Sequence, residues 1–234
     1  MPIEMHPFGQ LALPEGGPNP GVVMIPDVWG LSDLYERLAG RLAEAGFAVL
    51  VMDPYRKTGG RGDFSDPAGA MAFIRELSDP LVIETVQEGI DALAAHPAVA
   101  GQKVGVIGFC MGGMYALHAA CSCTGLSAAA PFYGMIRNEA GLDPEKKPRA
   151  PIDALKDLTC PVLGQYGEED ALIPVQDVRD LEAALAGSSR GGTVHLYPGA
   201  GHAFLNDMRE EMYRPEQAAE AWSRLVPFLK ESLG

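Results

Sequence analysis

Cys110 lies on a stretch whose glycine spacing is typical of a catalytic nucleophile, Gly108-Phe-Cys-Met-Gly-Gly, directly after an apolar run and before a helical pattern. A nucleophile on so tight a strand-to-helix turn takes a strained backbone conformation. Its neighbours two residues away on each side then approach closely, which suits Gly108 and Gly112. The N-terminus of the next helix favours a thiolate, and the backbone N–H of Met111 would point at an oxyanion on the attacked carbonyl. The spacing predicts a thiol nucleophile for acyl transfer.

Other interpretations of this stretch fit less well. A phosphate-binding loop needs Lys and then Ser or Thr after its last glycine, and here Met114 and Tyr115 follow Gly113. A dinucleotide-binding loop needs a different glycine spacing. A buried, inert cysteine is the remaining alternative. The strand, the two glycines and the helix together favour the nucleophile.

A nucleophile of this kind needs a general base and a group that orients the base. On scaffolds with such a turn, the chain order is nucleophile, acid, histidine, each on a loop after a later strand. Asp170 and His202 occupy the loops after the last two apolar runs. Glu168 and Glu169 are competing acids, and position within the loop favours Asp170.

A sheet covered on both faces must carry these loops, since several of the apolar runs do not alternate with polar residues. We expect strands at 21–25, 47–52, 103–109, 127–133, 161–166 and 193–197. Apolar residues at helical spacing predict helices at 31–45, 80–96, 111–121, 175–186 and 215–233. Alternation of strand and helix without a fixed period predicts a three-layer α/β fold with a mostly parallel sheet.

The domain organisation follows from length and composition. A chain of 234 residues suits one α/β domain spanning 1–234, in which residues 1–20 form an N-terminal arm or edge strand. Segments 57–67 and 136–151 have linker-like composition, but both follow predicted strands and should lie near the carboxyl edge of the sheet. We expect 136–151 to be a surface loop or a lid.

The charge balance excludes several partners. With 18 Lys and Arg against 31 Asp and Glu, the formal net charge is −13, which argues against nucleic acid and anionic membranes. No apolar run approaches the roughly 20 residues of a membrane span, and the N-terminus has no secretory pattern. Four cysteines are too few for a disulfide scaffold. We expect a cytoplasmic protein with reduced thiols, and the histidine spacing predicts no metal; no cofactor is expected.

Taken together, these residues resemble the dienelactone hydrolase family of α/β-hydrolases, over nearly the whole chain. The Gly-Phe-Cys-Met-Gly-Gly turn, with Cys where Ser is usual, is the most specific mark. The resemblance implies an α/β-hydrolase fold and a monomer. It also implies Cys110 as nucleophile, His202 as general base and Asp170 as the partner of His202.

The resemblance assigns roles on the loop after the first central strand as well. Asp27 matches an acidic residue that pairs with the cysteine before substrate binds, although family members commonly carry Glu there. The N–H of Val28 would complete the oxyanion hole with that of Met111. Members that hydrolyse enol lactones hold the substrate carboxylate with an arginine shortly after the histidine, where this chain has Asn206.

The implied activity is hydrolysis of a small-molecule activated ester or enol lactone, of the dienelactone (carboxymethylenebutenolide) type, through a thioester on Cys110. Four aromatic residues on nearby loops are candidates for an apolar pocket: Trp29, Tyr55, Tyr133 and Phe204. An esterase or thioesterase for another small acyl substrate is the alternative within enzymes. A protein without turnover on the same scaffold, or a redox sensor that uses Cys110, is the alternative outside them.

Overall fold

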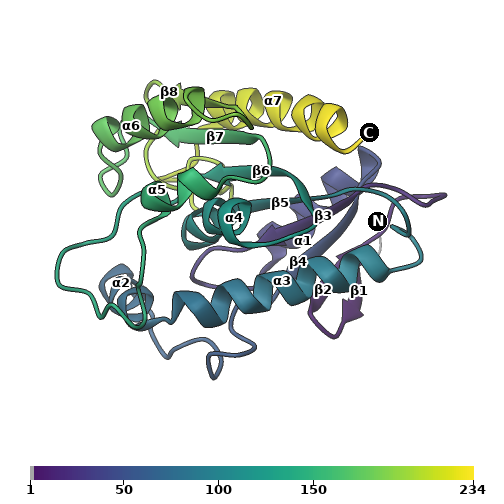
Figure 1. Cartoon of the computed structure of the whole chain (residues 1–234), viewed down its shortest axis with the longest axis horizontal. Helices are drawn as coiled ribbons and strands as arrows, with labels where there is room; N and C mark the ends of the chain where they lie inside the picture. The colour runs from purple at the N-terminus through teal and green to yellow at the C-terminus, as the bar shows by residue number, and fades with distance from the viewer. Residues whose placement is uncertain (1–2) are drawn as a thin grey trace.

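The computed structural model describes residues 3–234, so the first two residues of the predicted N-terminal arm lie outside the described range. Its centre is an eight-stranded sheet in the order β1-β2-β4-β3-β5-β6-β7-β8 (Figure 1). Strands β3 to β8 run parallel, and β1 and β2 form an antiparallel hairpin on the β4 edge. The strands are β1 (Ile3–His6), β2 (Gly9–Ala12), β3 (Gly21–Ile25), β4 (Ala48–Met52), β5 (Val104–Phe109), β6 (Leu126–Phe132), β7 (Val162–Gly167) and β8 (Gly192–Tyr197).

Helices cover both faces of this sheet. They are α1 (Asp33–Glu44), α2 (Pro67–Glu76), α3 (Asp79–Ala95), α4 (Met111–Ser122), α5 (Pro151–Ala154), α6 (Val175–Ala186) and α7 (Pro215–Leu233), with a 3₁₀ turn η1 (Leu155–Asp157). The order along the sheet reverses after β4, so right-handed crossovers place α1 on one face and α3 and α4 on the other. Helix α7 packs beside α1, where the Arg41 guanidinium lies 4.0 Å from the centre of the Trp222 ring. The fold is the predicted three-layer α/β architecture.

The predicted strands and the five predicted helices are all present, with ends within two residues of expectation. Every residue of β3, β4 and β5 is buried, which is why these runs are apolar on both faces rather than alternating. A parallel sheet brings the carboxyl ends of its strands to one edge. The loops after β3, β4, β5, β6, β7 and β8 therefore share that edge.

Helix α2 is an element that the sequence analysis did not predict. Asp66 caps it by accepting a hydrogen bond from the N–H of Gly69 at 2.9 Å, and Pro67 occupies its first turn. Only Ala70 and Ile74 of this helix are buried, so its apolar stripe is too short to stand out in the sequence. Asp followed by Pro was the available signal for its start.

Segment 136–151 follows β6 as irregular chain that ends in the short helix α5. The Lys147 ammonium is buried and lies 2.5 Å from the Asp79 carboxylate at the start of α3. The same Asp79 oxygen accepts a hydrogen bond from the Tyr115 hydroxyl of α4 at 2.7 Å. This buried pair fixes the segment to the body of the protein. Within residues 3–234, no helix has the length and apolar character needed to cross a membrane.

Candidate active site

The turn around Cys110 has the strained geometry that the glycine spacing predicts. Cys110 stands between β5 and α4 at φ 55° and ψ −117°, in a region that non-glycine residues rarely adopt. A Cβ at Gly108 would lie 2.0 Å from the carbonyl oxygen of Gly112. A Cβ at Gly112 would lie 2.2 Å from the carbonyl oxygen of Ile25. Both glycines are therefore required for the chain to turn sharply between strand and helix.

His202 and Asp170 form a hydrogen-bonded pair on the loops after β8 and β7. Nδ1 of His202 lies 2.8 Å from Oδ2 of Asp170, whose side chain is fully buried. The other oxygen, Oδ1, accepts the backbone N–H of Leu172 at 2.8 Å, so the carboxylate is fixed from both sides. Glu168 and Glu169 are exposed. Asp170, rather than either glutamate, is the carboxylate that is hydrogen-bonded to His202.

The second ring nitrogen of His202, Nε2, is the one left for proton exchange in the cavity that His202 and Cys110 both line. Nε2 is buried and has no hydrogen-bond partner among the described residues. Burial lowers the pKa of His202, but the charge of Cys110 and the hydrogen bond with Asp170 outweigh it and raise the pKa from 6.5 to about 10. The ring can therefore carry a proton beside the sulfur.

Three residues with strained backbone angles lie on loops at this edge of the sheet. Among the described residues, the non-glycine residues with positive φ are Cys110, Tyr133 at 37° and Ala203 at 58°. Tyr133 directly follows β6, and its N–H donates to the carbonyl of Gln165 at 2.8 Å. Its ring meets the His202 ring edge to face, with the centres 5.3 Å apart. Strain of this kind persists only where the surrounding structure holds it, and it is common at active sites.

The two amides expected to form an oxyanion hole are unpaired. Among the described residues, neither the N–H of Val28 nor that of Met111 donates a hydrogen bond. Gly112 packs directly on the end of β3, since a Cβ there would also lie 2.4 Å from the carbonyl oxygen of Pro26. The loop that carries Val28 therefore starts against the first turn of α4, which begins at Met111.

Asp27 lies in the same site without a hydrogen bond to Cys110. Its Oδ1 accepts the backbone N–H of Trp29 at 2.9 Å, and its own N–H donates to the Tyr35 hydroxyl at 3.0 Å. Burial raises the pKa of Asp27, while the Trp29 hydrogen bond and the charges of Arg209 and His202 act in the opposite direction. The activating pair between Asp27 and the cysteine is not formed in this structure.

A cavity of about 320 Å³ opens over Cys110 and His202. Its lining is Asp27, Val28, Trp29, Pro67, Ala70, Met71, Ile74, Cys110, Ala171, Leu172, His202, Ala203, Asn206, Arg209 and Met212. Of the four aromatic candidates, only Trp29 is among these residues. Tyr55, Tyr133 and Phe204 are buried behind the site and pack on other side chains, for example Phe204 on Tyr197. Helix α2 contributes four further apolar residues to the wall, none of them aromatic: Pro67, Ala70, Met71 and Ile74.

Arg209 is a residue of this cavity that the sequence analysis missed. It is the one Lys or Arg among the lining residues, and its guanidinium lies 5.1 Å from the centre of the Trp29 ring. Within residues 3–234, it forms no ion pair with a carboxylate. Asn206, three residues earlier, also lines the cavity, but its side chain accepts the N–H of Met208 at 3.0 Å. A cation without a carboxylate partner among residues 3–234 therefore lines the same cavity as Cys110, in a chain of net charge −13.

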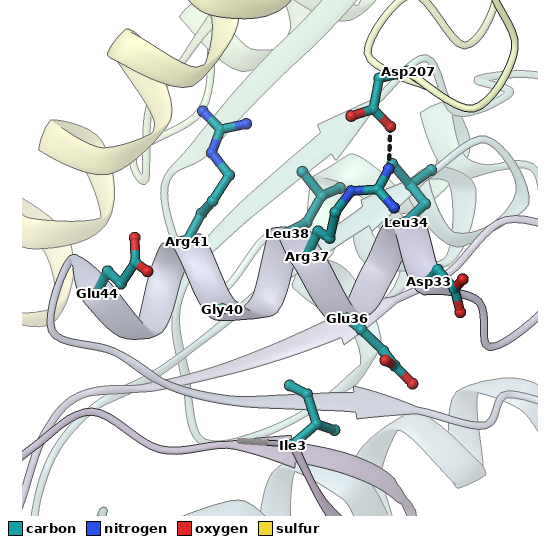
Figure 2. A pocket seen from close by; sticks show the side chains of 10 residues that line it. All are labelled: Ile3, Asp33, Leu34, Glu36, Arg37, Leu38, Gly40, Arg41, Glu44 and Asp207. Carbon is teal, nitrogen blue, oxygen red and sulfur yellow. Dashed lines mark hydrogen bonds and ion pairs between the residues drawn. The ribbon is translucent and has the colours of Figure 1, made fainter. Parts of the chain in front are cut away.

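A larger groove lies elsewhere, along the outer face of α1 (Figure 2). Arg37 of α1 forms an ion pair with Asp207 across it. Its lining has charged and aliphatic side chains but no Cys, His, Ser or Tyr. The groove therefore offers no thiol, hydroxyl or imidazole group, and the cavity over Cys110 is the candidate active site.

A strained nucleophile turn followed by an Asp–His pair on later loops defines the chain as an α/β-hydrolase. Solved structures agree: a "Putative Dienelactone Hydrolase" from Klebsiella pneumoniae subsp. pneumoniae MGH 78578 superimposes with a TM-score of 0.86 at 28% identity, covering 95% of this chain and 92% of that one. The profile of the dienelactone hydrolase family matches residues 8–233. The chain belongs to that family and is a hydrolase.

Two curated relatives carry more specific names. The carboxymethylenebutenolidase of Rhodococcus opacus is 31% identical over 218 residues, which is 93% of this chain and 83% of the relative. A Bradyrhizobium protein named "Probable 2-oxo-3-(5-oxofuran-2-ylidene)propanoate lactonase" is 29% identical over 214 residues, 92% of this chain and 84% of its own. The first name refers to a butenolide and the second to a propanoate lactone.

Proposed function

We propose that this hydrolase opens activated esters or enol lactones with Cys110 as nucleophile, through a thioester intermediate. The observation that carries the proposal is the state of His202. Its Nδ1 is held by Asp170, and its buried Nε2 has no partner among the described residues on a cavity that Cys110 also lines. A base held in this way can serve a nucleophile and a water molecule in turn.

In the first half of the reaction, the Cys110 thiolate attacks the carbonyl carbon and the C=O electron pair moves to oxygen. The N–H groups of Val28 and Met111 donate to that oxyanion, and the loss of one such donor in comparable sites costs about 10²–10³ in rate. The tetrahedral intermediate collapses with loss of the alcohol or enol oxygen, which takes the proton from the His202 imidazolium. The products of this half are a thioester on Cys110 and a neutral His202.

In the second half, His202 removes a proton from water as the water oxygen attacks the thioester carbonyl. The same amides hold the second oxyanion, and collapse expels the sulfur as a thiolate. Asp170 keeps Nδ1 protonated throughout, so that Nε2 is the nitrogen that exchanges the proton. A thiolate leaves more readily than an amine, so amides are poor substrates and enol or phenol leaving groups are good ones.

We propose further that the substrate carries an anionic group. The names of the Rhodococcus and Bradyrhizobium relatives refer to a butenolide and to a propanoate lactone. In this chain Arg209 is the cation available on the cavity, in place of the arginine that the family resemblance puts at position 206. The aliphatic side chains of α2 would pack against the flat apolar part of such a molecule.

The test is hydrolysis of p-nitrophenyl acetate and of a dienelactone by the purified protein and by Cys110→Ala. We expect turnover by the wild type, its loss in the variant, and an acetyl group on Cys110 in mass spectra of a rapid acid quench. Cys121→Ala is the matched control, because burial raises the pKa of the Cys121 thiol to about 12 and it lines no part of the cavity. Equal turnover by wild type and Cys110→Ala would contradict the nucleophile. Turnover of the simple ester alone would instead support an esterase for another acyl group.

A further inference from the structure

We infer that Tyr55 is a positioning residue that fixes the oxyanion hole, by tying together the two residues whose amides form it. This inference rests on the proposed function. Tyr55 follows β4, and its side chain is 2% exposed beneath the site. It lines no part of the cavity and so does not touch substrate. Its hydroxyl reaches Val28 on one side and Met111 on the other.

The contacts of that hydroxyl join two loops that are far apart in the sequence. The O–H donates to the carbonyl oxygen of Val28 at 2.7 Å. The same oxygen lies 3.5 Å from the sulfur of Met111, a weaker acceptor. Val28 belongs to the loop after β3, and Met111 begins α4 after β5. One buried hydroxyl thus contacts both residues expected to donate to the oxyanion.

Tyr55 is itself held firmly by its own loop. Its backbone N–H donates to the Asp53 carboxylate at 2.9 Å, and its carbonyl accepts the N–H groups of Thr58 at 3.1 Å and Gly60 at 3.2 Å. Its ring packs on that of Phe73 of α2, with the centres 5.4 Å apart. The hydroxyl position is therefore set independently of Val28, so the hydroxyl can fix the Val28 backbone.

The effect expected from this arrangement is on the transition state. Oxyanion donors accelerate the reaction because they are already oriented when charge develops on the carbonyl oxygen. The N–H and the carbonyl of Val28 belong to the two peptide planes that meet at its Cα. A hydrogen bond that holds the carbonyl plane therefore narrows the backbone angles of Val28, and with them the directions that the N–H can take. Without the hydroxyl, the N–H remains but its direction is less defined. Substrate binding, which precedes the charge, should be little affected.

The test compares Tyr55→Phe with Tyr115→Phe. The Tyr115 hydroxyl is equally buried and also makes a 2.7 Å hydrogen bond, to Asp79, but it contacts neither oxyanion residue. Steady-state kinetics and the p-nitrophenol burst of p-nitrophenyl acetate give kcat, KM and the acylation rate. The burst amplitude counts folded sites, so rates are compared per active site whatever fraction of the protein folds.

We expect Tyr55→Phe to lower the acylation rate and kcat per site by about tenfold, a part of the ~10²–10³ that loss of a whole donor costs, with KM within about twofold. Tyr115→Phe should lower the melting temperature and leave kcat per site unchanged. Wild-type rates in Tyr55→Phe, or equal rate losses in both variants, would overturn the inference. A Cys110→Ala variant with wild-type turnover would instead overturn the proposed function, so the two failures are distinguishable.

Discussion

Replacement of Arg209 by Gln separates the recognition of an anionic substrate from the chemistry of the site. The guanidinium stacks on Trp29, lines the cavity with Cys110 and His202, and forms no ion pair with a carboxylate within residues 3–234. Gln keeps a polar side chain of similar reach but removes the charge. We expect slower hydrolysis of an ester that carries a carboxylate and little change for its neutral analogue.

The magnitude follows from the position of the side chain. A hydrogen bond to a charged group contributes about 1.5–3 kcal/mol, and Arg209 is only half-buried, so solvent screens it and the lower end of this range applies. A difference of about 1.4 kcal/mol is a factor of ten. We therefore expect kcat/KM for the anionic ester to fall about tenfold. High salt should reduce the difference between wild type and variant, because the remaining attraction is screened.

The assay uses two p-nitrophenyl esters that differ only in whether the acyl chain ends in a carboxylate or in an amide. Arg37→Gln is the matched control, because it changes the net charge by the same amount at an exposed ion pair with Asp207 outside the cavity. The ratio of kcat/KM for the two esters should fall in Arg209→Gln alone. An equal loss on both esters, or the same fall in Arg37→Gln, would refute a direct contact between Arg209 and the substrate anion.

Three further outcomes are expected. Asp170→Asn should lower kcat by about three to four orders of magnitude, because the amide cannot keep His202 Nδ1 protonated; a loss below tenfold, with an unchanged circular dichroism spectrum, would count against the pair. Cys110→Ala should lower the pKa of His202 from about 10, since Asp170 alone then opposes the effect of burial; an unchanged midpoint in an NMR titration of the imidazole would contradict this. Lys147→Met should cost about 3–5 kcal/mol in urea unfolding by leaving the Asp79 carboxylate buried without its cation. Asp79→Asn in the same chain should recover part of the loss, and a cost below about 1 kcal/mol would mean that the pair does not anchor segment 136–151.

The sheet and the reactive residues could be predicted from the sequence because each depends on a local signal. Fully buried strands such as β4 are continuous apolar runs, and the turn at Cys110 needs glycines at fixed offsets. Asp170 and His202 follow from topology alone, since parallel strands bring successive loops to the same edge. These signals determine the order of the residues along the chain and the edge of the sheet at which each loop lies. That is enough to predict that Cys110, Asp170 and His202 share one edge.

The walls of the cavity could not be predicted in the same way, because they depend on how loops fold back. Arg209 reaches Trp29 because the loop after His202 closes on itself, with the N–H of Arg214 donating to the carbonyl of Phe204 at 2.9 Å. A count of residues after the histidine points to position 206 instead. Three of the four aromatic candidates were wrong for a related reason. Proximity to the carboxyl edge does not say whether a ring faces the cavity or, like Phe204, the core behind it.

The charges of the cavity would allow this acidic protein to bind the proposed anionic substrate. Burial raises the pKa of Asp27, whereas the positive charges of Arg209 and His202 lower it. An anionic substrate group on Arg209 would offset part of that positive charge, and the balance at Asp27 would shift toward its protonated form. Uptake of a proton by Asp27 would then mean that the cavity does not hold the Asp27 carboxylate and the substrate anion as two negative charges at once. Asp27 accepts the backbone N–H of Trp29, and Arg209 stacks on the ring of the same residue, so Trp29 connects the acid with the guanidinium. If Arg209 binds a substrate anion as proposed, selectivity for an anionic ester and the ionisation of Asp27 are linked properties of the same site.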